Sequence, residues 1–530
     1  MSDLELDPWR PVHAWLAEQA LQRPQQRFLL AGEGLSYAQA EARVQALAAV
    51  LRDQRGQRVA LWLDKGNAYA LGVLAALQAG CTYVPIDGAQ PATRAALILA
   101  DAAPTVLICD HSHACALLAQ GLPAGIERLL VAGDVAPQDL PAGVTLTLLG
   151  SALERLAPAS AEAEPAAATA APCQREDIAA ILYTSGSTVS PKGVQLSHLN
   201  LSNFIDWSVR ELGLDASDRL LKLASFNFDL STFDLFATLQ AGASLYVSAE
   251  HEIAQAHGVA ELLRLQAITT LYTVPSMYAL LNRVQAWQAL PPTQLRRLIF
   301  AGEVMPKPQL QTLARALGSG CVLYNFYGPT ETNVCLYHRV SSEELAHDGP
   351  VPIGTAIDGA TVWLVDEQGR LASGEGAFGE IWVAGRCVTP GYWKRQDAAN
   401  GSNHLRAMHA TGDYGEWLDG RLIYRGRKDR MLKINGYRVE LGEIEAVLAR
   451  HPYIAEAAVL ASGEAPQRLL AHVVMRDPAH SMGALELKAY CATQLPRYML
   501  PHQVQLHSAL PKNANGKTDY RALRDGQVTA

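Results

Sequence analysis

Short apolar runs alternate with amphipathic stretches through the first part of the chain. Residues 59–63 and 105–109 are continuous apolar runs of strand length, and between them residues 69–78 carry apolar side chains at helical spacing. Another helical pattern, residues 41–51, follows Ser36, a residue type that often begins helices. Strands that alternate with helices are typical of a layered α/β fold.

The pattern changes twice further along the chain. Apolar strands and amphipathic helices alternate again up to residue 335, which predicts a second α/β layer. From residue 354 short β-rich segments with glycine-containing turns predict a smaller β-rich subdomain. The pattern of helical and strand-like segments over residues 427–530 predicts a compact α+β unit. The expected fold is therefore α/β, with a large N-terminal region over residues 1–426 and a small C-terminal domain over residues 427–530.

The composition is that of an ordinary globular protein. Of 530 residues, 49% are hydrophobic and 18% are charged, which provides an ample core. The formal net charge of -8 gives no basic stripe, so neither nucleic acid nor a membrane is an expected partner. The chain shows no leader segment and no apolar run of about 18 residues, and its eight cysteines form no CxxC pair. We therefore expect a soluble, cytoplasmic protein with reduced thiols.

A loop rich in glycine and hydroxyl side chains follows the apolar run 178–182. Its sequence, YTSGSTVSPKGV over residues 183–194, combines flexible backbone, short donors and one point charge, which together suit phosphate. It lacks the spacing of a Walker loop. On composition alone, a flexible surface linker is an equal alternative. The residues expected to hold phosphate are Thr184, Ser185, Gly186, Ser187, Thr188 and Lys192.

This loop resembles the phosphate-binding loop of the adenylate-forming superfamily, which includes acyl-CoA synthetases, luciferases and the adenylation domains of nonribosomal peptide synthetases. The usual form is YTSGSTGxPKGV, and Val189 stands where the family has glycine. Other family motifs follow in their usual order, and a set of ordered motifs is far more specific than any one of them. They are GCTYVPID at 80–87, FYGPTE at 326–331, ATGDYGEW at 410–417 and NGKTDY at 515–520.

The resemblance implies ATP and Mg²⁺ as cofactors. In the family's pattern Tyr327 stacks on adenine, Thr330 touches the α-phosphate, and Glu331 holds Mg²⁺, a hard cation that prefers carboxylate oxygen. Asp413 would accept the ribose hydroxyls, with Arg427 as a second ribose contact. Taken singly, these Gly-Pro and Gly-Asp segments are also common turns. Two further residues implied for the adenine pocket are Gly302 and Asn325.

The resemblance is closest to the branch that activates amino acids. Asp229 stands where those members place the carboxylate that pairs with the substrate's α-ammonium group. A carboxylate in an apolar stretch is costly without a cationic partner, and a bound substrate would supply one. The alternative is helix capping, because Asp229 and Ser231 could begin a helix. We favour the substrate role. Lys517 matches the lysine that contacts the substrate carboxylate and the α-phosphate.

The expected side-chain pocket is small and almost entirely apolar, since only Thr273 among its members is appreciably polar. The pocket residues implied by the resemblance are Asp229, Leu230, Phe233, Thr273, Ile299, Ala301, Phe326, Val334, Cys335 and Lys517. The set is similar to that of free-standing prolyl-activating enzymes, which makes L-proline the leading candidate. Thr273, Ile299 and Phe326 depart from that set, so alanine, valine and a cyclic or β-branched nonproteinogenic acid stay open.

The family's chemistry implies a two-step ligase. The amino acid is adenylated and is then transferred to the phosphopantetheine thiol of a carrier, which we expect to be a separate protein because only a short tail follows Lys517. Asp429 matches the hinge of the small domain, Lys433 could face the site in a second orientation, and Gly436 would line the thiol's approach. The alternatives are an acyl-CoA or aryl-CoA ligase, a luciferase-like oxygenase and a catalytically silent regulatory homologue.

Overall fold

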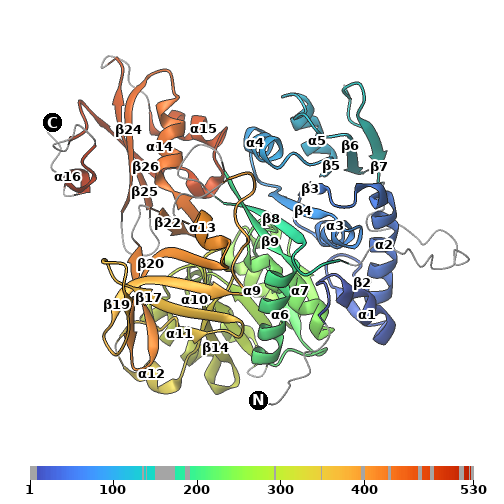
Figure 1. The fold of residues 1–530 in the computed structure, drawn as a ribbon, viewed down its shortest axis with the longest axis horizontal. Coiled ribbons are helices and arrows are strands. Elements are labelled where there is room, and N and C mark those ends of the chain that lie inside the picture. The colour runs from blue at the N-terminus through green and yellow to red at the C-terminus, as the bar shows by residue number, and fades with distance from the viewer. Residues whose placement is uncertain are drawn as a thin grey trace, which may run out of the picture.

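The computed structural model describes most of the chain. The described residues are 9–133, 136–138, 140–149, 173–184, 191–291, 294–347, 349–395, 400–427, 431–462, 468–477, 483–512, 518–524 and 526. They form two large α/β units, a five-stranded sheet and a C-terminal α+β unit (Figure 1). The predicted fold class is confirmed.

The first α/β unit is built on a seven-stranded sheet in the order β7-β6-β5-β3-β4-β8-β9, parallel except for the last pair. The buried faces of its inner strands explain their continuous apolar runs. The strands are β3 (Arg58–Leu63), β4 (Thr82–Asp87), β5 (Val106–Asp110), β6 (Arg128–Ala132), β7 (Thr145–Leu148), β8 (Ile178–Thr184) and β9 (Lys192–Ser197), and the helices are α2 (Tyr37–Val50), α3 (Asn67–Gln78), α4 (Ala92–Ala102) and α5 (His111–Leu118). Helix α2 begins in a capping box between Ser36 and Gln39.

The second unit is built on a nine-stranded sheet in the order β16-β15-β14-β13-β12-β10-β11-β1-β2. Its strands are β1 (Arg27–Leu29), β2 (Leu35–Ser36), β10 (Arg219–Lys222), β11 (Ser244–Val247), β12 (Thr270–Thr273), β13 (Arg297–Phe300), β14 (Val322–Tyr327), β15 (Leu336–Arg339) and β16 (Thr355–Ala356). Its helices are α1 (Ala14–Gln22), α6 (His198–Leu212), α7 (Leu230–Ala241), α8 (Glu250–Ile253), α9 (Ala256–Leu265), α10 (Pro275–Arg283), α11 (Lys307–Leu317) and α12 (Ser342–Ala346). The two units share one hydrophobic core, in which Tyr69 of the first stacks on Phe226 of the second at 4.3 Å.

The remaining elements form the β-rich sheet and the C-terminal unit. The sheet holds β17 (Ala360–Val365), β18 (Leu371–Ala372), β19 (Phe378–Gly385), β20 (Met408–Leu418) and β21 (Arg421–Arg427), next to the short helix α13 (Gly401–His404). The C-terminal unit holds β22 (Met431–Ile434), β23 (Tyr437–Glu440), α14 (Leu441–Ala449), β24 (Ile454–Ser462), β25 (Arg468–Met475), α15 (Ala484–Ala492), β26 (Gln503–His507) and α16 (Tyr520–Arg524). The domain boundary predicted after residue 426 stays a prediction.

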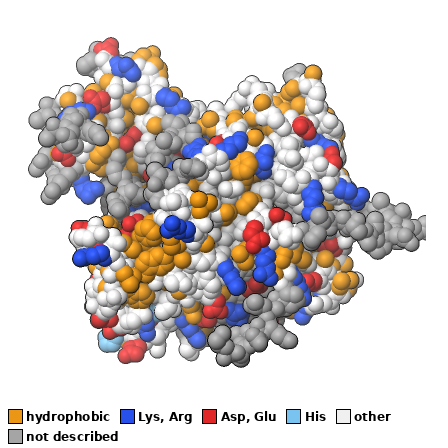
Figure 2. Space-filling model, in the orientation of Figure 1, with side chains coloured by type: hydrophobic (Ala, Val, Ile, Leu, Met, Phe, Trp, Pro, Cys, Tyr) orange, Lys and Arg blue, Asp and Glu red, His pale blue; other side chains and the backbone are white. Residues whose placement is uncertain are grey.

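The surface agrees with the mixed composition. In Figure 2 basic and acidic side chains are interspersed over the face in view, and hydrophobic side chains gather over β17 and β20. Within the described part of the chain no helix is long and apolar enough to cross a membrane. All eight cysteines lie in described segments, and none of them forms a disulfide there.

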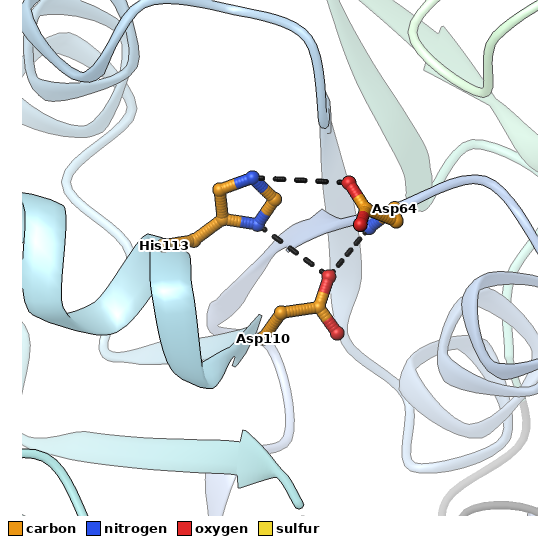
Figure 3. Close-up of side chains that lie close together, drawn as sticks. All are labelled: Asp64, Asp110 and His113. Carbon is orange, nitrogen blue, oxygen red and sulfur yellow. Dashed lines mark hydrogen bonds and ion pairs between the residues drawn. The ribbon is translucent and has the colours of Figure 1, made fainter. Parts of the chain in front are cut away.

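His113 on α5 contacts the backbone at the carboxyl ends of β3 and β4. Its Nδ1 lies 3.0 Å from the Trp62 carbonyl oxygen and its Nε2 lies 3.1 Å from the Gly88 carbonyl oxygen. The carboxylates of Asp110 and Asp64 lie 3.5 Å and 3.9 Å from the same two nitrogens (Figure 3). Both nitrogens therefore face acceptors, which only the doubly protonated ring satisfies. A ring that donates from both nitrogens carries a positive charge, so in this state the trio is an ion-pair cluster.

We expect the His113 cluster to make stability depend on pH. Burial lowers the pKa of His113, but Asp110, followed by Asp64, outweighs burial and raises it above the ordinary value of about 6.5. The stabilisation is therefore fully present below about pH 6.5 and is lost as the pH rises through the folded-state pKa. Urea unfolding of wild type and His113→Gln should differ more at about pH 5.5 than at about pH 9. His251→Gln, at an exposed histidine, is the control, and a His113→Gln difference that grows toward alkaline pH would contradict this account.

Candidate active site

The candidate site lies at one edge of the nine-stranded sheet. Strands β10, β12, β13 and β14 are parallel neighbours, so the loops that follow them meet at the same edge. These loops contribute Asp229, Val274, Gly302 and Thr330. The β22–β23 hairpin of the C-terminal unit enters the same place, and the cavity between them has a volume of only about 30 Å³. That volume holds about one or two water molecules, so the hairpin fills most of the site.

Asp229 lies directly before α7, yet it does not cap that helix. Its backbone is already helical, with φ -62° and ψ -30°, and its carboxylate makes no capping hydrogen bond. Its Oδ2 instead accepts a hydrogen bond of 2.8 Å from the hydroxyl of Thr330. The capping alternative is therefore wrong. The carboxylate lines the cavity, and burial raises its pKa, although Thr330 and Lys433 act in the opposite direction.

Three of the residues predicted to bind nucleotide come together where the end of β14 meets strands β20 and β21 of the β-rich sheet. The Tyr327 hydroxyl donates to Oδ2 of Asp413 at 2.6 Å, and Arg427 Nη1 pairs with Oδ1 of the same carboxylate at 2.7 Å. Asp413 and Arg427 are 3% and 8% exposed. Burial and the charge of Asp413 raise the pKa of Tyr327, so the phenol stays protonated and donates. Asn325 and Gly302 are placed at the ends of β14 and β13, where Asn325 donates to the Pro352 carbonyl.

Glu331 is the residue in this site whose surroundings suit a metal ion. Its carboxylate is 1% exposed, and Oε1 accepts from the Tyr392 hydroxyl at 2.6 Å and from Arg438 Nη1 at 2.8 Å. Oε2 is buried and accepts no hydrogen bond from any described residue. A buried carboxylate oxygen without a donor is the ligand type that Mg²⁺ prefers. Glu331 therefore fits the magnesium role implied by the sequence.

The predicted side-chain pocket divides into two layers. Leu230, Ala301 and Val334 line the cavity itself. The others are buried around it and close it off: Phe233, Thr273, Ile299, Phe326 and Cys335. Tyr272, which the sequence reasoning missed, also lines the cavity and packs edge-on against both Phe233 and Phe326. This aromatic packing leaves space for a small side chain only.

Several predicted residues lie outside the described part of the chain. They are Ser185, Gly186, Ser187, Thr188 and Val189 of the phosphate loop, the hinge Asp429 and the catalytic Lys517. Of the loop's flanks, Thr184 ends β8, and the Lys192 ammonium at the start of β9 lies 5.8 Å from the centre of the Tyr392 ring. Tyr392 in turn donates to Glu331, which connects the phosphate loop to the proposed metal ligand.

The β22–β23 hairpin contributes Lys433, Gly436 and Arg438 to the site. The first two were named from the sequence, and Arg438 was missed. Asn435 and Gly436 form its two-residue turn with φ of 50° and 79°, the left-handed values that an Asn-Gly hairpin turn requires. The Gly436 amide donates to Glu303 at 2.9 Å, and a Cβ on Gly436 would meet Val274 Cγ1 at 2.2 Å. Lys433 and Arg438 line the cavity from the two strands of the hairpin. The Asn-Gly pair marks the turn in the sequence, but no local signal shows where the hairpin docks.

Comparison with known proteins identifies the family. Residues 16–393 match the AMP-binding enzyme family, and residues 443–517 match the AMP-binding enzyme C-terminal domain. The chain belongs to the AMP-binding enzyme family. The predicted membership of the adenylate-forming superfamily is confirmed, and so is the prediction of an ATP-dependent adenylating ligase.

Two curated relatives align over almost their whole length. An L-proline:L-prolyl-carrier protein ligase of Streptomyces coelicolor is 47% identical, covering 92% of this chain and 91% of the relative. A ligase of the same name from Pseudomonas fluorescens is 36% identical over 93% and 94%. The Vibrio cholerae adenylation domain AlmE, solved with glycyl-adenosine-5'-phosphate, superimposes with a TM-score of 0.80 over 99% of both chains. Its 23% identity supports the fold alone.

Removing the carboxylate of Asp413 should destabilise the protein strongly, because the largely buried guanidinium of Arg427 would lose its ion pair of 2.7 Å. We expect Asp413→Ala to lower the free energy of unfolding by about 3–5 kcal/mol. Asp53→Ala is the control, because the Asp53–Arg128 pair is exposed and such pairs contribute about 0–1 kcal/mol. Chemical denaturation of the two variants checks the expectation, and equal losses would contradict it.

Proposed function

We propose that this protein activates L-proline with ATP and loads it onto the phosphopantetheine thiol of a separate carrier protein. The observation that carries the proposal is the Asp229 carboxylate, which Thr330 holds at a small, largely apolar cavity. A buried carboxylate needs a cationic partner, and the substrate's α-ammonium group would be that partner when the hairpin with Lys433 is not docked. The two ligases named for L-proline and a prolyl-carrier protein support the same substrate and partner.

The first step is the attack of the amino acid's carboxylate oxygen on the α-phosphorus of ATP, with pyrophosphate as leaving group. Asp229 orients the substrate through its ammonium group, and Tyr327, Asp413 and Arg427 position the nucleoside. Lys192 and the loop hydroxyls hold the leaving phosphates. Mg²⁺ on Glu331 would supply positive charge beside the phosphate oxygens. Lys517 and Thr330 offset the charge that develops on the five-coordinate phosphorus.

The second step is the attack of the carrier's thiol on the carbonyl carbon of prolyl-AMP, which releases AMP. The docked hairpin places Gly436 next to Gly302 and Val274 at the end of the sheet. A glycine there leaves room for a narrow thiol arm beside the backbone. We assign the observed arrangement to this second step. The small domain would therefore swing about Asp429 between the two steps.

The alternative ligases account less well for Asp229. An acyl-CoA or aryl-CoA ligase presents no cation to a buried carboxylate, and a luciferase-like oxygenase has the same difficulty. A silent regulatory homologue would have no need of a phosphate-loop lysine, yet Lys192 and Lys517 are both present. The amino-acid-activating reading explains all three residues.

Amino-acid-dependent exchange of pyrophosphate into ATP tests the substrate. L-Proline should give the strongest exchange among the proteinogenic amino acids, because a charged side chain would stay unpaired in this pocket. Asp229→Asn should lower the kcat/KM for proline by roughly 10²-fold, the scale of losing one buried charge pair. Asp358→Asn, at an exposed acid, is the control. Strongest exchange with lysine, aspartate or glutamate would overturn the assignment.

Two variants should separate the half-reactions. Lys517→Ala should slow adenylation by roughly 10²–10⁴, the scale of losing one electrostatic contact to the transition state, and spare transfer from supplied prolyl-AMP. Gly436→Val should do the opposite, since its Cβ would collide with Val274 when the hairpin docks. Pyrophosphate exchange measures the first step, and carrier loading from prolyl-AMP measures the second. If both steps suffer equally in both variants, the two-orientation mechanism is wrong.

A further inference from the structure

Glu331 receives its positive charge from a distant part of the chain. Arg438 lies on β23 of the docked hairpin, 107 positions further along, and its Nη1 lies 2.8 Å from Oε1 of Glu331. Among the described residues, Arg438 is the only cationic side chain within ion-pair distance of this carboxylate. The Tyr392 hydroxyl donates to the same oxygen, and His409 acts on Glu331 through charge alone. The ion pair forms only because the hairpin is docked.

The Glu331 carboxylate is only 1% exposed and needs one positive partner. Two such partners, Arg438 and a metal ion, would compete for it. Burial raises the pKa of Glu331, but Arg438 more than compensates and holds it well below its ordinary value. Mg²⁺ binds carboxylate oxygen at about 2.0–2.1 Å and keeps a strict octahedral shell. A guanidinium on one oxygen of Glu331 and a divalent cation on the other would lie within a few ångströms of each other in a poorly screened interior.

We propose that Arg438 and Mg²⁺ are alternative partners of Glu331, so that the hairpin docks only after the metal has left that carboxylate. The proposal rests on the proposed function, in which Glu331 is the magnesium ligand of the adenylation step. Once the first step is complete, Glu331 would be a buried carboxylate without its metal, and it would attract Arg438 and with it the small domain. Arg438 is thus a positioning residue that couples the end of the first step to the start of the second.

Thermodynamic linkage makes the coupling measurable without turnover. If Mg²⁺ binds only the undocked arrangement, Mg²⁺ must weaken docking and docking must weaken Mg²⁺ binding by the same factor. Energy transfer between dyes incorporated at the exposed residues Leu21 of α1 and Leu485 of α15 reports docking. Titrating Mg²⁺ alone, at constant ionic strength and without ATP or amino acid, should depopulate the docked arrangement of the wild type.

Three variants isolate the role of Arg438. In Arg438→Met the docked fraction should no longer fall with Mg²⁺, whereas Arg438→Lys keeps the charge and should restore the fall. Arg94→Met is the matched control, because the Arg94–Glu443 pair also joins the C-terminal unit to the first α/β unit but has no place at Glu331. It should lower docking at every Mg²⁺ concentration while keeping the response to Mg²⁺. Equal responses in wild type and Arg438→Met, or no response in the wild type, would overturn the proposal.

The proposed function is tested separately. The dye measurement contains no substrate, so its result does not depend on which amino acid is activated. Pyrophosphate exchange by the wild type with L-proline decides the proposed function without reference to docking. A protein that exchanges with proline but shows no Mg²⁺ response refutes the coupling alone, and the reverse result refutes the substrate alone.

Discussion

The need of three buried carboxylates for positive charge is the constraint on which this site depends. Asp229, Glu331 and Asp413 are all at most 8% exposed and come from separate parts of the N-terminal region. In the described structure their cationic neighbours are Arg427 at the end of β21 and Lys433 and Arg438 on the β22–β23 hairpin. Because unpaired buried charge is costly, the acids hold these basic side chains, and the hairpin with them, in place. The same three carboxylates are the proposed contacts of the amino acid, the metal and the ribose. Ligand binding and hairpin docking therefore use the same side chains.

Much of the fold could be predicted because local signals and burial agree in it. The continuous apolar runs became the inner strands β3 and β5, which are buried on both faces. Ser36 does begin a helix, although α2 starts at Tyr37, earlier than the apolar spacing indicated. What could not be predicted depends on long-range pairing. Strands β1 and β2 precede the first unit in the sequence, yet they extend the edge of the nine-stranded sheet next to β11. Strands of only three and two residues carry no sequence pattern that indicates β11 as their partner.

The site residues also fall into those that a sequence motif predicts and those that only long-range packing defines. Tyr327, Asp413 and Arg427 were named by motif, and they do converge, because Asp413 pairs with Arg427 across β20 and β21 and Tyr327 ends β14 beside them. Tyr272 was missed, since an aromatic residue in a strand looks like ordinary core until its neighbours are known. Arg438 was missed for a different reason. A basic residue beside a turn is usually solvated surface, and only the docking of the hairpin turns it into the partner of Glu331.

The forces that hold the hairpin differ in how they respond to ligands. Tyr437 stacks on Phe228 at 5.4 Å and on Tyr498 at 3.9 Å, and the Arg94–Glu443 pair is buried. None of these contacts involves a residue assigned to ATP or metal, so they favour docking whatever the site contains. Arg438 and Lys433 instead interact with Glu331 and Asp229, the proposed ligands of the metal and of the amino acid. The small domain therefore docks through contacts that do not change with ligands, and through ion pairs that a bound ligand would break. It should dock when the site is empty and undock when the metal or the amino acid binds the carboxylates. Two successive reactions in one cavity require such a change of arrangement.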